Sequence, residues 1–398
     1  MRASASRLLL FTVFLFLFAA ISLGCRGLQA GGNEVGGGNG GGGTLGATVS
    51  PVKRVIVVVM QNRSFDHLFG KYTPTAGQTI NGIRAGVPGF TQSDGTQPFQ
   101  QTATSFGDLP HDRNDYLASW NQGAMNKFSV TEGRNSMGYF TSSTPGISQL
   151  WSLADNYALA DNYFASVMSN APSNELYLVS ASDNNFPFSV QPFYGPCNQP
   201  DPAAQAYTFQ NVGDQLNSNN ISWGWFQENY GDCGNGYVAV QNAFQFFTST
   251  QGSAHLQDLS AFSSALNAGT LPAVSFVMPS DAHGTHPSAG SISVGLTWLD
   301  DFVSQAKASP NWGSLAIVVI WDESGGFWDH VPPPQIDSQG LGMRVPMLAI
   351  SPFAKPGFVS HTRMDHVSVL KFIQWNWSLG SLNAREDQSQ DIREMFQF

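Results

Sequence analysis

Four short, mostly apolar runs rich in valine and isoleucine limit the folds open to this chain. They span residues 55–60, 273–278, 315–320 and 345–350. An unbroken run of this kind suits a strand buried on both faces of a parallel sheet. Apolar residues at helical spacing between 293 and 308, and between 367 and 377, predict helices between the later strands. The sequence therefore predicts an α/β fold, a three-layer α/β/α sandwich around a mostly parallel central sheet.

The first 25 residues have the features of an export signal. Arg2 and Arg7 precede an apolar run over residues 8–21, and small residues follow it up to Cys25. This arrangement is typical of a secretory leader. Cys25 directly after Gly24 also resembles a bacterial lipoprotein acylation site, which would tether the protein to a membrane. Ordinary cleavage and an uncleaved anchor are the alternatives, and all three predict a periplasmic, envelope-bound or secreted protein.

Residues 26–50 are predicted to form a flexible linker, since ten glycines lie between Gly31 and Gly46. Residues 51–398 are then the folded domain. Within it, the segment of about 185–265 is rich in Asn, Gln, Phe and Tyr and only weakly periodic, which favours a loop-rich insertion. Beyond Cys25 the chain has two cysteines, Cys197 and Cys233. In an oxidising compartment they are expected to form a structural disulfide.

The charge balance excludes some functions. The 398 residues carry 18 Lys and Arg against 28 Asp and Glu, a net charge of −10. Nucleic-acid binding needs a basic surface, so it is not expected. Charged residues make up only 12% of the chain while glycine is plentiful, which argues against an ordinary cytoplasmic helical protein.

Polar residues follow three of the predicted strands at the point where each strand ends. They occupy residues 61–67, 279–287 and 321–330. In open α/β sheets ligands bind at the carboxyl ends of the strands. We therefore expect these three segments to meet at one edge of the sheet and to form an active site.

The residue types at this edge suggest a metal and proton transfer. Asp322, Glu323 and Asn62 offer the oxygen ligands of a hard divalent cation, and added imidazoles would admit zinc or manganese. The alternative is that Asp322 caps a turn and Glu323 is solvated. Histidines next to a carboxylate or a proline are candidates because such neighbours fix the ring; in order of preference they are His286, His111, His366, His330 and His283.

Longer motifs resemble a known family. Residues 57–70, with the sequence VVVMQNRSFDHLFG, and residues 321–334, WDESGGFWDHVPPP, resemble signatures of the bacterial phosphoesterase family. Segments 159–164, 286–287, 340–346 and 365–370 extend the resemblance over roughly residues 52–378. The family includes phosphatidylcholine-type phospholipases C and an acid phosphatase, and it is similar in fold to alkaline phosphatase.

The resemblance implies a function and roles for residues. Such enzymes hydrolyse phosphate esters, phospholipids among them, with divalent metal ions and a Ser or Thr nucleophile. Position 61 and Asn62 would face the metal and the phosphate, and Asp322 and Glu323 would be metal ligands. The resemblance also implies that His111 and His286 bind phosphate oxygens or protonate the leaving group. His366 and His330 belong to motifs of the family, and His366 is counted with the catalytic candidates.

Two positions depart from the family pattern. The family's metal-binding Glu is Gln61 here, which removes a negative charge. Alignment on Asn174 puts Ala171 where the nucleophile is expected. Ser173, at a predicted helix start where N–H groups bind anions, is the favoured substitute; Ser169 and a plain N-cap role for Ser173 are alternatives. Two hypotheses remain: an exported metal-dependent phosphoesterase, or a weakened relative that binds a phosphorylated ligand or an envelope partner.

Overall fold

The computed structural model describes residues 43–74, 77–186, 196–197 and 205–398. The predicted leader, Cys25 and most of the predicted linker lie outside these residues. In the described ranges, no helix has the length and apolar character needed to cross a membrane.

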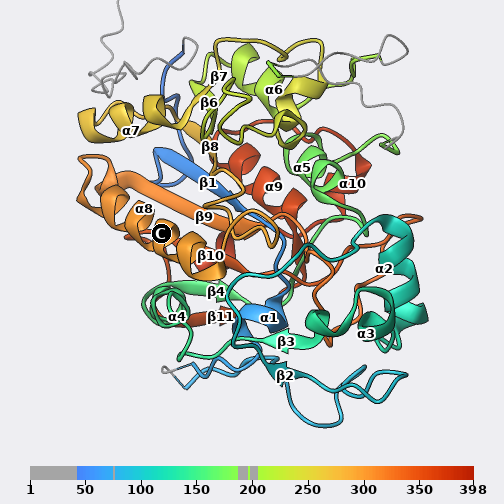
Figure 1. The fold of residues 1–398 in the computed structure, drawn as a ribbon. Coiled ribbons are helices and arrows are strands. Elements are labelled where there is room, and N and C mark those ends of the chain that lie inside the picture. Colours follow the sequence, from blue (N-terminus) through green and yellow to red (C-terminus); the bar gives the residue numbers. More distant parts are fainter. Residues whose placement is uncertain (1–42, 75–76, 187–195, 198–204) are drawn as a thin grey trace, which may run out of the picture. The chain divides into compact units, whose positions relative to one another are not determined.

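The core of the fold is an eight-stranded sheet (Figure 1). Its order is β11 (Phe358–Ser360), β4 (Ala158–Ala160), β10 (Met347–Ile350), β9 (Leu315–Trp321), β1 (Arg54–Met60), β8 (Val274–Met278), β6 (Trp223–Gln227) and β7 (Leu256–Asp258). Every neighbouring pair is parallel except the two that involve β10, which is antiparallel to both β9 and β4. All seven residues of β1 and of β9 are buried, as expected for strands covered on both faces. The predicted mostly parallel sheet is confirmed.

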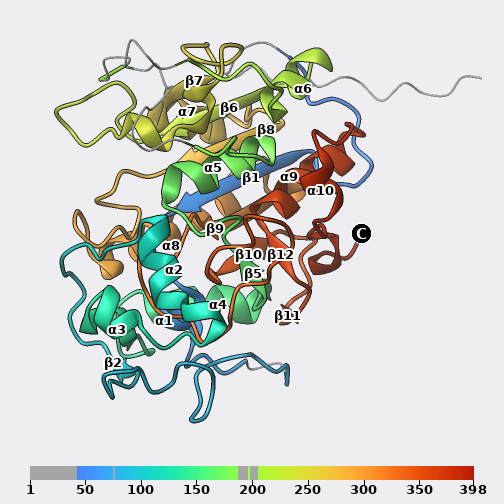
Figure 2. The ribbon, with the colours of Figure 1, turned by 90° about the vertical axis from the view of Figure 1, so that its right-hand side faces the viewer.

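Helices cover both faces of this sheet (Figures 1 and 2). On one face lie α4 (Ile147–Asn156), α7 (Leu259–Ala268) and α8 (Ile292–Ala308). On the other lie α5 (Ala171–Ser180), α6 (Val212–Ser218), α9 (His366–Asn376) and α10 (Ala384–Asp387). The helices predicted over 293–308 and 367–377 are α8 and α9. The three-layer α/β/α prediction is confirmed.

Shorter elements fill the region beyond the carboxyl ends of the strands. The helices are α1 (Phe65–Phe69), α2 (Arg113–Trp120) and α3 (Phe128–Thr131). Two small parallel pairs join β2 (Phe99–Gln100) to β3 (Gly138–Tyr139), and β5 (Tyr163–Phe164) to β12 (Met364–Asp365). Figure 1 shows α2 and α3 beside the end of the sheet where α1 leaves β1.

The structure differs from the predicted boundaries in two places. Residues 43–50 are packed on the domain rather than extended as a linker: Thr44 pairs with Ile221, and the Leu45 carbonyl accepts a hydrogen bond from the Trp377 indole. The described part of segment 185–265 contributes β6 and β7 to the central sheet, so it is not an insertion outside the α/β layers. The search for runs rich in valine and isoleucine did not find β6, because its sequence, WGWFQ, has no β-branched residue.

The predicted disulfide is confirmed. Cys197 and Cys233 are bonded, with their Cα atoms 5.3 Å apart. The bridge joins the segment before α6 to the loop that follows β6.

Candidate active site

The ends of three adjacent strands bring the predicted polar segments together. β1 lies between β9 and β8, and Met60 is in register with Trp321. Gln61 and Asn62 therefore leave the sheet beside Asp322 and Glu323, and the Asn62 N–H donates to Asp322 Oδ1 at 2.9 Å. The Gln61 N–H donates to the carbonyl of Gly284, in the loop after β8, at 2.7 Å. The expectation that these segments meet at one edge of the sheet is confirmed.

The turn after β1 has a special backbone. Asn62 has a φ of +58°, in the left-handed region that asparagine tolerates better than most residues. Gly325 packs against this turn, since a Cβ at position 325 would lie 2.6 Å from the Asn62 Cβ and carbonyl oxygen. The glycine pair that follows Asp322 and Glu323 thus allows the two strand ends to approach closely.

Four buried oxygens at this edge have no hydrogen-bond partner within the described residues. They are Gln61 Oε1, Asn62 Oδ1, Asp322 Oδ2 and Glu323 Oε1. All four side chains are at most 2% exposed. Buried polar atoms are normally satisfied, and an unpaired buried carboxylate is especially costly. Amide and carboxylate oxygens are the ligands of hard divalent cations, so the residues present fit such an ion.

The two neighbouring carboxylates repel each other electrostatically. Burial and the Glu323 charge raise the pKa of Asp322 well above its ordinary value. Burial also raises the pKa of Glu323, against the opposing effect of His111. The second oxygen of Glu323 accepts hydrogen bonds from the Tyr116 hydroxyl and the Gly325 N–H, which fix its orientation.

His111 reaches this group from the loop before α2. Its Nε2 lies 3.4 Å from Asn62 Nδ2 and 3.8 Å from Glu323 Oε1, and its Nδ1 contacts the Leu109 carbonyl. Burial alone would lower the pKa of His111, but Glu323, the Leu109 carbonyl and Asp108 raise it to about 9. The ring is 17% exposed, so it lies between the carboxylates and solvent.

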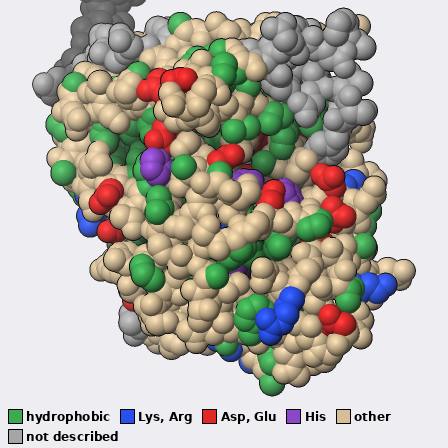
Figure 3. All heavy atoms as spheres, in the orientation of Figure 1, with side chains coloured by type: hydrophobic (Ala, Val, Ile, Leu, Met, Phe, Trp, Pro, Cys, Tyr) green, Lys and Arg blue, Asp and Glu red, His purple; other side chains and the backbone are tan. Residues whose placement is uncertain are grey.

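The loop after β8 places its two histidines differently. The His286 ring is among the groups that lower the pKa of Glu323, and its Nδ1 lies 3.0 Å from the Ser288 hydroxyl. His283 instead pairs with Glu228 at 2.9 Å, at the end of β6. Figure 3 shows histidine and acidic side chains gathered on one face of the molecule. The structure therefore brings His286, and not His283, toward the carboxylates.

His366 lies behind the carboxylates. Its Nε2 contacts the Asp322 carbonyl at 2.6 Å, and its Nδ1 contacts the Tyr163 hydroxyl at 2.8 Å. Burial lowers the pKa of His366 to about 4, so the ring is neutral and donates from Nε2. Both ring nitrogens are thus used to support the backbone of Asp322.

His330 belongs to a separate buried network. Asp66, Asp329 and His330 have possible ligand atoms within 4.8 Å of one another. However, Arg344 Nη2 lies 3.0 Å from Asp66 and Arg344 Nε lies 2.9 Å from Asp329, while His330 Nδ1 lies 2.6 Å from Asp66. A buried guanidinium already supplies the positive charge that a metal would bring. This network is better explained as a structural ion cluster than as a metal site.

The N-terminal part of α5 holds the candidate nucleophile. Asn170 is the N-cap position, so the alternative that Ser173 is the N-cap is wrong. The Ser173 hydroxyl is buried and has no hydrogen bond among the residues described. Burial raises the pKa of Asp183, and the nearby Ser173 hydroxyl opposes this rise, so Ser173 lies near Asp183. Within the described residues, the Ser173 hydroxyl makes no hydrogen bond to Asp322 or Glu323.

Sequence reasoning missed Glu175, two residues further along α5. This side chain is 1% exposed, and neither carboxylate oxygen has a partner among the described residues. Burial, Asp322 and Asp281 raise the pKa of Glu175 well above its ordinary value. The signal that could have drawn attention to it was helical spacing. Residues 171 and 175 are four positions apart, so in a helix they lie on the same face.

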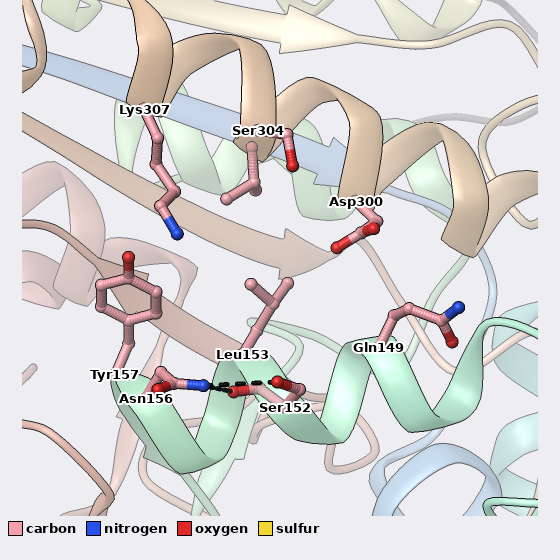
Figure 4. Close-up of a pocket in the computed structure, with 9 residues that line it drawn as sticks. Gln149, Ser152, Leu153, Asn156, Tyr157, Asp300, Ser304 and Lys307 are labelled. Atoms are coloured by element: carbon pink, nitrogen blue, oxygen red, sulfur yellow. Dashed lines mark hydrogen bonds between the residues drawn. The ribbon is translucent and has the colours of Figure 1, made fainter.

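A second cavity on the domain contains none of the residues of the candidate site. It has a volume of about 350 Å³ and lies between α4 and α8 (Figure 4). Lys307 points toward Tyr157, with its Nζ 5.7 Å from the ring centre. None of the residues that line it belongs to the strand ends, so it is distinct from the candidate site.

Unsatisfied carboxylate and amide oxygens at the strand ends of a mostly parallel α/β sheet are suited to holding a hard divalent cation. The profile of the Phosphoesterase family matches residues 52–380, most of the described domain. The chain therefore belongs to the Phosphoesterase family.

Curated relatives and solved structures were also found. A non-hemolytic phospholipase C of Burkholderia pseudomallei is 27% identical, over 82% of this chain and 55% of the relative. Phospholipase C B of Mycobacterium tuberculosis is 27% identical over 82% of this chain and 73% of the relative. This chain thus spans about half the length of the first of these. Murine ectonucleotide pyrophosphatase/phosphodiesterase 5 is similar with a TM-score of 0.47 and 9% identity, covering 86% of this chain and 100% of that one.

Proposed function

We propose that this protein hydrolyses phosphate ester bonds with a divalent cation held by Gln61, Asn62, Asp322 and Glu323. The observation that carries the proposal is the convergence of four unsatisfied buried oxygens from two adjacent strand ends. Family membership and relatives named phospholipases C support phosphate esters as substrates, in phospholipids or in simpler monoesters. When bound, the cation would polarise the phosphoryl group.

Three histidines of the chain are proposed to contact the substrate or to position the metal ligands. His111 lies at the exposed side of Glu323, where its Nε2 can meet a phosphoryl or leaving-group oxygen. His286 approaches the same carboxylate from the loop after β8. His366 contacts the backbone of Asp322 and does not border the open side of the site, so it is a positioning residue.

The attacking group is proposed to be water rather than Ser173. Glu175 and Ala171 share one face of α5, while Ser173, two residues from Glu175, projects to a different side. Ser173 makes no hydrogen bond to Asp322 or Glu323, and position 171, where the family pattern expects the nucleophile, is an alanine without a hydroxyl. In this reaction the water oxygen bonds to phosphorus and gives up one proton, the bond from phosphorus to the alcohol oxygen breaks, and that oxygen takes up one proton, so the products are the alcohol and the phosphate.

The second hypothesis from the sequence, a relative that only binds a phosphorylated ligand, is favoured by Gln61 and Ala171. A turnover assay separates the two. The full chain would be incubated with a chromogenic phosphomonoester and with a phosphorylcholine diester, after chelation and after addition of Mn²⁺, Zn²⁺, Ca²⁺ or Mg²⁺. We expect hydrolysis of at least one substrate that depends on added metal. Folded protein without turnover under any of these conditions would support the binding relative.

We also propose that the protein is exported through the leader in residues 1–25, with Cys25 as the site of a lipid tether. The Cys197–Cys233 disulfide supports an oxidising compartment, because disulfides rarely persist in the cytosol. Mass spectrometry of the purified mature protein would show an acylated Cys25, another new N-terminus, or the intact leader.

A further inference from the structure

We propose that Thr285 is a positioning residue of the candidate site, and that its hydroxyl holds Gln61 in place as a ligand of the divalent cation. This inference rests on the proposed function, because Gln61 is one of the ligands proposed there. Thr285 lies in the loop after β8, directly before His286.

The backbone of Thr285 has a conformation that threonine rarely adopts. Its φ is +74°, in the left-handed region, and within the described ranges it is the only β-branched residue with a positive φ. Glycine and asparagine are the usual residues there, because a branched side chain meets the backbone. Such a conformation persists only where the surrounding contacts enforce it, and it is common at functional sites. A threonine at this position therefore needs a reason that lies in its side chain.

The Thr285 hydroxyl joins two strand ends. It donates to the Gln61 carbonyl at 2.6 Å and accepts from the Trp321 indole N–H at 3.1 Å. Thr285 and Trp321 are both 0% exposed, so these bonds are shielded from bulk water. Gln61 directly follows β1, and Trp321 is the last residue of β9. One hydroxyl thus ties the loop after β8 to both strands that lead into the proposed ligands.

This loop holds Gln61 on both sides of its backbone. The Gln61 N–H donates to the Gly284 carbonyl at 2.7 Å, while the Gln61 carbonyl accepts from Thr285. The Gln61 side chain packs against Gly284, where a Cβ would lie 2.4 Å from Gln61 Oε1. That oxygen is buried and has no hydrogen-bond partner among the described residues. The loop therefore fixes the main chain of Gln61 and leaves its side-chain oxygen for the cation.

Two further contacts hold Thr285 itself. The Arg63 guanidinium donates from Nη2 to the Thr285 carbonyl at 2.6 Å, and the same guanidinium lies 4.7 Å from the centre of the Phe327 ring. Gly295 of α8 packs on the threonine methyl group, since a Cβ at position 295 would lie 2.5 Å from Thr285 Cγ2. The turn is thus preorganised, as the residues that support a binding site must be.

Removal of the hydroxyl should reach the cation through Gln61. The buried Gln61 carbonyl would lose the Thr285 donor, and the Trp321 indole N–H would lose its acceptor, each of which is costly enough to favour a shift of the backbone. Outer partners that orient metal ligands typically contribute about 10- to 100-fold to metal affinity or activity. We therefore expect a loss of metal affinity in this range.

The test measures Mn²⁺ affinity by calorimetry on the full chain, beside the melting temperature of each variant in chelator. Two pairs at position 285 differ only in the hydroxyl: the wild type against Thr285→Val, and Thr285→Ser against Thr285→Ala. The second pair also lacks the branched side chain, so it gives the comparison even if T285V does not fold. Thr250→Val is the matched control, because Thr250 is 0% exposed and its hydroxyl donates to the Phe244 carbonyl at 2.8 Å, outside the candidate site.

We expect T285V and T285A to bind Mn²⁺ at least about tenfold more weakly than the wild type, and T285S to bind within about threefold of it. T250V should bind like the wild type, although it loses a comparable buried hydrogen bond and some of its melting temperature. Metal affinity would then depend on the hydroxyl at position 285 and not on the stability of the fold.

Asp322→Asn separates this inference from the proposed function. If D322N abolishes Mn²⁺ binding while folded T285V and T285A bind as tightly as the wild type, Thr285 has no positioning role and the proposed site still stands. If T285S binds as weakly as T285A, or T250V as weakly as T285V, the hydroxyl of Thr285 is not the cause and the inference is wrong. If the wild type binds no Mn²⁺, the proposed site and this inference both fail.

Discussion

Asn62 shows how one residue can set the geometry of the whole site. Its left-handed backbone turns the chain sharply after β1, so that its N–H meets Asp322 while its side-chain oxygen stays free. Strained conformations of this kind persist where the surrounding structure enforces them, and they cluster at functional sites. Here Gly325 and the Asp322 carboxylate provide that enforcement.

Ser173 and Ala171 give a residue-level test of the nucleophile. We predict that Ser173→Ala keeps at least about half of the metal-dependent turnover, because serine nucleophiles typically contribute orders of magnitude more. Ala171→Ser puts a hydroxyl at the position where the family pattern expects the nucleophile, so a change in turnover or a trapped phosphoryl group is expected there. Steady-state kinetics and intact-mass measurements would follow both variants. A thousandfold loss in folded, metal-bound S173A would contradict attack by water.

Glu132 gives a residue-level prediction of pH dependence. It accepts a hydrogen bond from Ser119 and is 3% exposed, and burial raises its pKa from 4.5 to about 8. Because the folded-state pKa is raised, its stabilising contribution is complete below about pH 4.5 and is lost as the pH rises toward 8, at up to about 1.4 kcal/mol per pH unit. Glu132→Gln removes this loss.

Thermal unfolding from pH 5 to pH 8 measures the effect. The melting temperature of E132Q, relative to the wild type, should increase with pH over this range. Asp232→Asn, at an exposed loop residue, serves as the control for changing a carboxylate to an amide and should show a constant difference. A constant difference for E132Q as well would mean that Glu132 is ionised in the folded protein.

At the scale of elements, the strands that carry the site were predictable, and the surroundings of the side chains on α5 were not. The runs at 55–60 and 315–320 are apolar and β-branched, so both the strands and the residues after them could be placed from the sequence. The burial of Glu175 could not be predicted, because it depends on where α5 begins and which face it presents. The strand β6 and its neighbour at the sheet edge, β7, were missed because aromatic and polar residues there obscure the pattern.

The buried ion cluster ties several elements together and gives a prediction at this scale. Arg344, in the segment before β10, joins Asp66 of α1 to Asp329 beyond β9. Arg344→Met leaves two buried carboxylates without their cation, so we expect a loss of about 3–5 kcal/mol of unfolding free energy. Chemical denaturation of the chelated protein would measure it. The number of Mn²⁺ ions bound by the folded variant should not change; a change would show that this cluster, too, holds a metal.

For the molecule as a whole, the sheet determines which parts of the sequence meet. Residues 61–62 and 322–323 are some 260 positions apart, yet parallel pairing of β1 and β9 places them side by side. Short-range patterns predicted this meeting because parallel strands share one carboxyl edge. They did not predict which histidines face the edge: His111 does so from a distant loop, whereas His283 and His330 pair with Glu228 and Asp66 instead.

The proposed function depends on one claim, that the strand-end oxygens hold the cation used in phosphate-ester hydrolysis. Asp322→Asn tests it most directly, by metal-dependent turnover measured beside Mn²⁺ affinity, with Asp232→Asn as the matched control. We predict that D322N loses both, with turnover falling more than about 100-fold, beyond the usual effect of removing an outer-shell partner. Wild-type turnover and metal affinity in folded D322N would contradict the claim.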